Sequence, residues 1–480
     1  MSAKRTHQWT AVFMVLTLLL TGCSSGAATE STTVATATTT TVTSTVVTTV
    51  TTTTEAPTTT TELCSHSTVA TTTKVPTAKP TTKPTTPKKP NQLSVVDMMA
   101  GIKAKTVTDK DATEERFVNA HTQFAVKLLQ GAVKAEQGGN VLVSPLSVQL
   151  TLAMVANGAN GKTKAEMETV FGGIPMSELN HYLYNYWTAL PMADDYKVQI
   201  ANSLWINSRS GINVPKTFLQ TNADYYGAQV YKGDFSNKTI NDMNYWVKQN
   251  TRGVVDEIVD RLDSKSDMMV LLNTLFFEAN WEKTYGSSHV STGKFTAANG
   301  TERSVTMMTQ TETMRYINDG EATGFAKDYK DGYYSFVALM PNKGTSLDEY
   351  VASLTAEEVQ NALGSGAIQV HAALPKFAYE CDLDMNAILT EMGMPTAFSA
   401  SADFSGLDTA GQGACLGEVR HKTHIELSEE GTKAGAATAA KVLKGMRDVS
   451  VTLDRPFVYM IVDNTTYLPI FVGAVKDITN

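Results

Sequence analysis

The chain has 480 residues, of which 40 are Lys or Arg and 48 are Asp or Glu, for a net charge of −8. Charges of both signs are scattered along it, which argues against a nucleic-acid-binding protein, because such a protein needs a clustered basic face. Four cysteines are too few for a disulfide-stapled scaffold. Cys381 and Cys415 could pair, and buried or free thiols fit the sequence at least as well.

The first 22 residues have the layout of an export signal. Lys4 and Arg5 precede an apolar run over residues 9–20, and small residues follow at once. Cys23 then resembles the lipidated cysteine of a bacterial lipobox; the alternative is an ordinary signal cleaved nearby. We therefore expect residues 1–22 to be a lipoprotein signal peptide. The protein would be exported and held only by its lipid on the outer face of a bacterial cell membrane, exposed to the extracellular space.

Residues 23–90 have a strongly biased composition. Between positions 31 and 90, 28 of 60 residues are Thr and six are Pro, and none is Phe, Tyr, Trp or Gly. Such a segment cannot bury enough apolar surface to offset the entropy lost on ordering. We predict a disordered tether, which its Thr and Pro content also makes a candidate for O-glycosylation.

The remainder, residues 110–480, carries the folding signals. No Gly-, Pro- or Ser-rich linker divides it, so we predict one domain of mixed α and β structure. The predicted elements in chain order are a helix after a capping box at 111–114, a short strand from Asn140 that runs into a helix ending at 157–158, a strand at 201–206, a helix from Ile240, a buried strand at 271–277, and two final strands joined at 463–464.

A run of small residues near the carboxyl end is the most informative stretch. Residues 429–440 read Glu-Glu-Gly-Thr-Lys-Ala-Gly-Ala-Ala-Thr-Ala-Ala. Ala favours helix, but Gly435 interrupts the run and no apolar stripe of helical spacing could dock a helix. With a period of two, one face is small and nearly apolar, and the other carries Lys433 and Lys441. This pattern suits a strand that slides into a packed sheet, where a large side chain would be stopped.

This run resembles the hinge of the serpins, serine protease inhibitors that insert their reactive loop into a β-sheet. Similar segments follow the family's order over about 370 residues, among them Ser144-Pro145-Leu146-Ser147, Asn280-Trp281 and Leu374-Pro375-Lys376-Phe377. The resemblance implies the mixed α+β serpin fold, with three β-sheets, about eight or nine helices and an exposed reactive loop. The implied hinge consists of Glu429, Glu430, Gly431, Thr432, Lys433, Ala434, Gly435, Ala436, Ala437 and Thr438.

The resemblance also implies a polar network beneath the point where the central sheet parts. A buried imidazole and hydroxyls can hydrogen-bond across a seam between strands and hold it shut until something displaces them. A tryptophan should mark the upper end of this seam. By family position these residues are Ser144, Ser147, Asn273 and His421, with Trp281 at the upper end.

The implied mechanism is suicide inhibition. A protease attacks one bond of the exposed loop and forms an acyl-enzyme, and residues 432–443 then enter the sheet as a new central strand. The family's spacing from Gly431 places the reactive bond at Gly445–Met446, which suits an elastase-like or subtilisin-like serine protease. Lys444 and Arg447 keep a trypsin-like target open, and cysteine endopeptidases are a further class of partner.

Other motifs point to no second chemistry. Residues 156–163 resemble a phosphate-binding loop, but a helix precedes them where that motif needs a strand. The eight histidines show no metal-ligand spacing, so we expect no cofactor, no metal and no catalytic residue. A non-inhibitory binding protein on the serpin fold is the alternative, and a hydrolase comes third. We expect a monomer and leave loop–sheet polymerisation open.

Overall fold

The computed structural model describes residues 12–22, 93–107, 114–253, 255, 257–411, 413–431 and 449–479. The chain divides into two compact units, Met1–Ser24 with Val75–Asn480 and Ser25–Lys74, and all described residues belong to the first. The predicted tether and the predicted lipidation site Cys23 lie outside the described residues. Within the described ranges, no helix combines the length and apolar character that a membrane span requires.

The described residues form nine α-helices. Residues 111–113 of the predicted capping box lie outside the described residues, and α1 (Glu115–Ala135) has Glu114 as its N-cap, whose side chain makes no capping bond. Its carboxylate instead accepts a hydrogen bond from the Tyr182 hydroxyl of α4. The other helices are α2 (Pro145–Ala156), α3 (Gly161–Val170), α4 (Met176–Ala189), α5 (Lys216–Tyr226), α6 (Asn237–Asn250), α7 (Leu347–Ser353), α8 (Ala356–Leu363) and α9 (Asn386–Met392), with 3-10 turns at Ser287–His289, Lys330–Gly332 and Pro395–Phe398.

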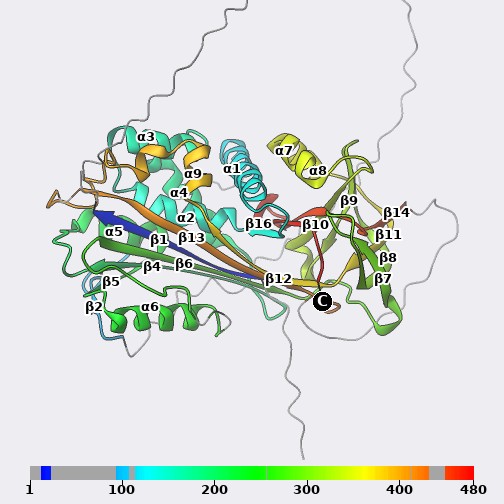
Figure 1. Cartoon of the computed structure of the whole chain (residues 1–480), viewed down its shortest axis with the longest axis horizontal. Helices are drawn as coiled ribbons and strands as arrows, with labels where there is room; N and C mark the ends of the chain where they lie inside the picture. The colour runs from blue at the N-terminus through cyan, green and yellow to red at the C-terminus, as the bar shows by residue number, and fades with distance from the viewer. Residues whose placement is uncertain are drawn as a thin grey trace, which may run out of the picture. The chain divides into compact units, whose positions relative to one another are not determined.

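Seven strands form the first sheet, and four of them are long. The strand from the amino terminus, β1, lies in its interior and is antiparallel to both neighbours, β13 and β6. Figure 1 shows β1 in blue beside the long strands of this sheet. The strand order is β12 (Phe377–Asp384), β13 (Ala414–Leu427), β1 (Val12–Gly22), β6 (Asp267–Ala279), β4 (Tyr196–Asn207), β5 (Gln229–Gly233) and β2 (Val96–Asp97).

The described residues join into two hydrogen-bonded sheets, whereas three were expected. The long β8 is shared, since it pairs with β7 and β11 along most of its length and with β9 through its last four residues. The second sheet has the order β14 (Val449–Thr452), β11 (Ala367–Pro375), β8 (Glu302–Asn318), β9 (Ala322–Asp328), β10 (Tyr334–Pro341), β15 (Phe457–Asp463), β16 (Leu468–Val475) and β3 (Val141–Val143), with β7 (Val290–Thr296) beside β8.

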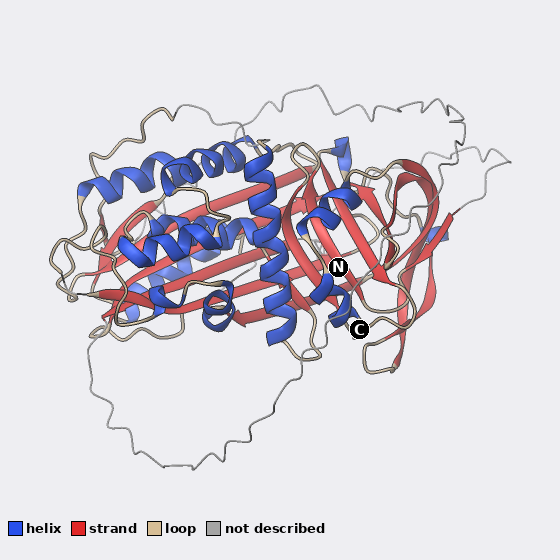
Figure 2. Ribbon diagram, turned by 90° about the horizontal axis from the view of Figure 1, so that it is seen from above, coloured by secondary structure: helices blue, strands red, loops and turns tan. Residues whose placement is uncertain are grey.

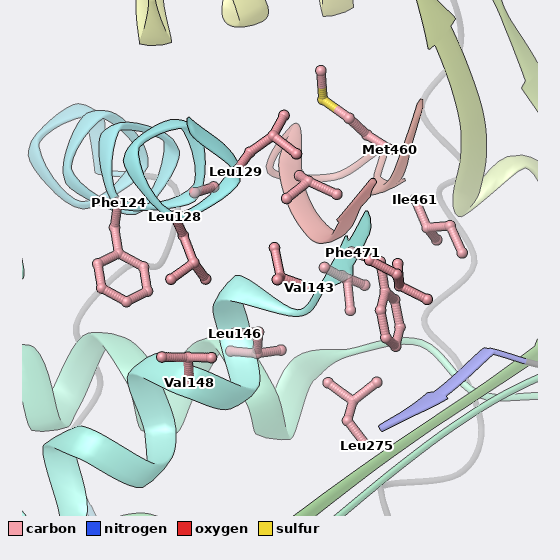
Figure 3. Packing of buried hydrophobic residues seen from close by; sticks show 14 of the residues in the cluster. Phe124, Leu128, Leu129, Val143, Leu146, Val148, Leu275, Met460, Ile461 and Phe471 are labelled. Carbon is pink, nitrogen blue, oxygen red and sulfur yellow. The ribbon is translucent and has the colours of Figure 1, made fainter. Parts of the chain in front are cut away.

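The main core lies where α1 and α2 meet both sheets. Every residue of α2 is buried, as expected for a helix that is apolar all round. Figure 3 shows α1 side chains such as Leu128 facing Leu146 and Val148 of α2, with Leu275 of β6 nearby. Seen from above in Figure 2, helices lie across the long strands. A burial this complete fixes α2 beneath the first sheet.

A second, smaller core lies on the other face of the first sheet, under α6. It contains Trp205 of β4 and Trp246 of α6, both fully buried. The first sheet is thus covered on both faces, and its interior strands need apolar side chains on both. The predicted strands at 201–206 and 271–277 fall inside β4 and β6, which confirms them.

Candidate functional site: the seam of the first sheet and its hinge

The first turn of α2 lies beneath the seam between β13 and β6. Ser144 is the N-cap of α2, and its Oγ accepts the Ser147 N–H at 3.4 Å and donates to the Ile470 carbonyl at 2.9 Å. The Ser144 backbone N–H donates to Nε2 of His421 on β13, 3.0 Å away. Because Nε2 accepts, the neutral ring carries its proton on Nδ1. The cap of α2 therefore also holds β13.

Ser147, one turn further along α2, holds the opposite strand. Its hydroxyl donates to Oδ1 of Asn273 on β6. The Asn273 amide donates in turn to Asn202 Oδ1 on β4, at 2.6 Å, and the Asn202 amide donates to the Tyr226 carbonyl at 2.8 Å. All these side chains are buried. The two serines thus tie both strands that flank the seam to one helical turn.

The four predicted residues meet beneath the sheet, but not by bonding across the seam. Leu16 of β1 pairs with both His421 and Asn273. One strand therefore separates these two residues, a gap of roughly 10 Å at about 4.8 Å per strand. Burial lowers the pKa of His421 to about 3, and its Nδ1 has no hydrogen-bond partner among the described residues.

Trp281 lies at the other end of the seam, where the chain turns out of β13. Its indole N–H donates to the Ser428 carbonyl at 3.0 Å, and its backbone N–H donates to the Glu430 carbonyl at 3.2 Å. The Tyr285 N–H donates to the Glu429 carbonyl at 2.9 Å. The predicted hinge residues that the structure describes are therefore fixed by backbone contacts. We call Trp281, Tyr285 and residues 428–431 the hinge cluster.

Gly431 closes this turn and could be no other residue without strain. Its φ is +67°, and a Cβ there would lie 2.3 Å from the Trp281 backbone nitrogen. L-residues disfavour this backbone region. A bridge between Ser428 and Gly431 reverses the chain directly after β13. Gly431 is the last described residue of this turn.

A buried ion pair beneath the hinge cluster is absent from the sequence predictions. Lys327 of β9 is 1% exposed and its ammonium bonds the Glu312 carboxylate of β8. The ammonium also lies 4.7 Å from the centroid of the Tyr285 ring and 5.5 Å from that of Trp281. Burial lowers the pKa of Lys327. The sequence signal that could have indicated this buried ion pair is a single Lys within the apolar stretch around Phe325.

The interior position of the first sheet between β13 and β6, which we call the slot, is occupied by β1. Leu16, Leu18 and Leu20 are fully buried in the main core, and Val15 is buried in the smaller core on the opposite face. Small side chains were predicted only for a strand that enters an already packed sheet, so the large side chains of β1 do not contradict that prediction. Large side chains fit when the sheet is packed around them, and small ones are needed only to enter a sheet that is already packed.

Several predicted site residues lie outside the described residues: Thr432 to Thr438 of the hinge, and Lys444, Gly445, Met446 and Arg447 at the reactive bond. The disulfide between Cys381 and Cys415 left open above does not form. Cys381 is a free, buried thiol opposite Thr423. Cys415 lies eight residues along β13 from Thr423, roughly 27 Å at 3.4 Å per residue, far beyond the reach of a disulfide.

The structure thus combines an interior strand position between β13 and β6 with a glycine turn at the end of β13. The Serpin (serine protease inhibitor) family model matches residues 119–478. The chain belongs to this family, which confirms the predicted fold. Protease inhibition is the activity that the family supports in general.

Relatives and solved structures agree with this assignment. Serpin A9 of Mus musculus is 30% identical over 383 residues, which cover 75% of this chain and 88% of that protein. Leukocyte elastase inhibitor A of Mus musculus is 28% identical over 379 residues, or 75% of this chain and 99% of that protein. The thermophilic serpin tengpin in its native state has 37% identity and a TM-score of 0.74, covering 80% of this chain and 100% of that one.

Proposed function

We propose that the exported form of this protein is a membrane-tethered inhibitor of serine endopeptidases that acts by loop insertion. The observation that carries this proposal is the hinge cluster. It reverses the chain after β13 at Gly431, and a segment that continued in that direction could reach the slot. Cleavage of that loop would free its end, and the acylated protease would be drawn along as the loop enters.

The register of the hinge supports this direction of insertion. Continuing the antiparallel ladder from the Ser428–Gly431 bridge would place Lys433 opposite Glu426 and Thr438 opposite His421. A cross-strand pair of opposite charge is worth roughly 0.2–1 kcal/mol. The Thr438 hydroxyl could accept from His421 Nδ1–H, the donor that has no partner among the described residues. The inserting loop therefore complements the slot.

The free energy available is sufficient for the task. A new central strand of about a dozen residues adds a similar number of ladder hydrogen bonds at about 0.5–1.5 kcal/mol each. The sum, on the order of 10 kcal/mol, compares with the total stability of about 5–15 kcal/mol of an ordinary domain. Insertion could thus deform the active site of an attached protease, and the native state before insertion would be metastable.

We place the reactive bond at Gly445–Met446 and propose an elastase-like or subtilisin-like target. Gly before the bond suits a protease with a shallow specificity pocket. Lys444 or Arg447 would redirect the inhibitor to trypsin-like enzymes. We further propose that lipidated Cys23 and the Thr-rich residues 24–90 hold the inhibitor above the membrane. Replacing Cys23→Ser should then shift the protein from the membrane fraction to the soluble fraction.

The test uses processed protein purified from membranes and incubated with elastase-like, subtilisin-like and trypsin-like proteases. We expect an SDS-stable complex on a denaturing gel and a released peptide that begins at Met446 by mass. A peptide that begins at Gly445 would assign the bait to Lys444. Clean cleavage with full protease activity retained in every case would contradict inhibition.

A further inference from the structure

The occupant of the slot is the amino-terminal segment that the sequence identifies as an export signal. We propose that residues 12–22 are an intramolecular plug: in a chain that keeps its amino terminus, they hold the slot, and the protein is not an inhibitor until they are removed. This inference rests on the proposed function, since it concerns the same slot that the cleaved loop would need.

The first support is strand geometry. β1 is antiparallel to both β13 and β6 and pairs with residues 414–425 of β13 and 267–277 of β6. A loop that turns back at Gly431 would run antiparallel to β13 as well. Leu16 pairs with His421, the position that the hinge register assigns to Thr438. The plug and the loop would therefore pair with the same residues of β13 and cannot both do so at once.

The second support is packing on both faces of the sheet. Leu16, Leu18 and Leu20 join the main core, while Val15 and Leu19 contact the smaller core under α6. At the far end of the strand, a Cβ on Gly417 of β13 would lie 2.7 Å from Thr21 Cγ2. β13 therefore approaches β1 closely through a residue that has no side chain. A segment apolar on both faces suits an interior strand as well as it suits a signal.

The third support is a set of buried polar atoms that the plug leaves without hydrogen-bond partners. Thr17 Oγ1 in β1 itself, and Thr274 Oγ1 and His421 Nδ1 on the neighbouring strands, are buried, and none has a hydrogen-bond partner within the described ranges. Thr274 and His421 pair directly with Val15 and Leu16. Apolar side chains cannot satisfy these polar groups. The slot is thus better matched to a strand with a hydroxyl, such as Thr438, than to the segment that fills it here.

The consequence is a switch tied to processing. The same residues cannot lie in the sheet and in the export machinery, so a chain that folds before export buries its signal and stays inactive. Removal of the segment during export empties the slot and leaves a chain able to insert its loop. The plug would also protect the unprocessed chain from accepting a second copy's loop at this position.

The experiment compares the full chain produced without export, called the uncut chain because it keeps residues 12–22, with the processed protein purified from membranes. Trapping of an elastase-like protease is followed for both by gel and by residual activity. The double variant Leu16→Asp/Leu18→Asp should expel the plug without cutting. Val96→Asp is the matched control, because Val96 is 63% exposed at the far edge of the same sheet.

If the plug holds the slot in about 99 of 100 molecules, trapping by the uncut chain should be about 100-fold slower than by the processed protein. Leu16→Asp/Leu18→Asp should restore the processed rate, and Val96→Asp should not. Hydrogen exchange adds a readout independent of inhibition: the amides of residues 15–20 should be protected in the uncut chain and exposed in the double variant.

Equal trapping by the uncut and processed proteins, or unprotected amides at 15–20 in the uncut chain, would overturn the plug while leaving the proposed inhibition intact. If no form traps any protease, the proposed function fails, and the exchange of these amides still decides whether the plug occupies the slot.

Discussion

At the hinge end of the seam, the backbone and side-chain donors of Trp281 both find carbonyl partners, and the turn at Gly431 admits no larger residue. In the middle of the seam, Thr17, Thr274 and His421 each bury a polar atom that has no partner among the described residues. The hinge is thus built for one fixed arrangement. The middle leaves three polar atoms without partners, which is what the proposed exchange of its strand would lead us to expect.

The largest loss of stability should come from breaking the ion pair between Lys327 and Glu312 under the hinge cluster. Lys327→Met leaves the Glu312 carboxylate buried without its cation, and removing one partner of a buried pair costs about 3–5 kcal/mol. Urea unfolding of the full chain measures the loss. The double variant Lys327→Met/Glu312→Leu removes both charges and should recover most of the stability. A single variant that unfolds at the wild-type midpoint would contradict the pairing.

A second way to break the hinge is Gly431→Ala. The backbone conformation alone costs an L-residue about 1–2 kcal/mol, and the contact with the Trp281 nitrogen adds to it. We expect a lower unfolding midpoint and a shift from trapped complex to cleaved, released inhibitor. Gly173→Ala is the matched control, because Gly173 has φ +72° and nothing lies within 4 Å of the position that its new methyl group would take. Equal losses of stability in both variants would show that the contact with the Trp281 nitrogen adds nothing to the cost of the substitution.

The middle of the seam should respond to pH through His421. Its pKa is lowered to about 3 by burial, against about 6.5 in the unfolded chain. Between these values the unfolded state binds more protons, so stability is complete above about pH 6.5 and falls as the pH drops. From pH 7.5 to 5 this group should remove about 2 kcal/mol.

The check is urea unfolding of wild type and His421→Gln at both pH values. The variant should lose about 2 kcal/mol less than wild type over this interval. His289→Gln, at an exposed position, is the matched control. Parallel losses in wild type and His421→Gln would show that His421 is not buried in its neutral form.

The smallest expected effect on stability concerns Thr17. Replacing Thr17→Val in the uncut chain removes a buried hydroxyl that has no partner in the described structure, and we expect a gain of about 1 kcal/mol. Thr423→Val provides the contrast, since that hydroxyl donates to the Leu142 carbonyl at 2.9 Å and its loss should cost about 1 kcal/mol. Thermal unfolding of the two variants should shift in opposite directions.

Much of the fold and of the seam could be predicted from the sequence, because their signals are local or keep a fixed order. The small-residue run after Gly431, with its period of two, predicted a strand able to enter a sheet, and Thr432 to Thr438 of this run lie outside the described residues. The strand and helix around Ser144 and Ser147 came from local signals, but the place of these serines beneath the seam, like that of Asn273 and His421, came only from the resemblance to the family. Nothing in their own neighbourhoods indicates that α2 ties them together.

The occupant of the slot could not be predicted, because an apolar run bounded by polar residues fits both an export signal and a buried strand. The pair of Lys327 and Glu312 was missed for another reason. It depends on the register between β8 and β9, which is set by packing and turn geometry and cannot be derived from the sequence of either strand alone. The Leu side chains in the slot show that the small-residue run alone does not tell which strand the folded sheet contains.

The pinned turn at Gly431 gives the proposed insertion a starting point and therefore a direction. A loop anchored there must zip along β13 from Leu427 toward Ala414, so that its cut end arrives last. β13 has 14 residues, which makes this journey roughly 48 Å at about 3.4 Å per residue. The length of β13 would therefore set the distance over which an attached protease is displaced from the position at which it cleaved the loop.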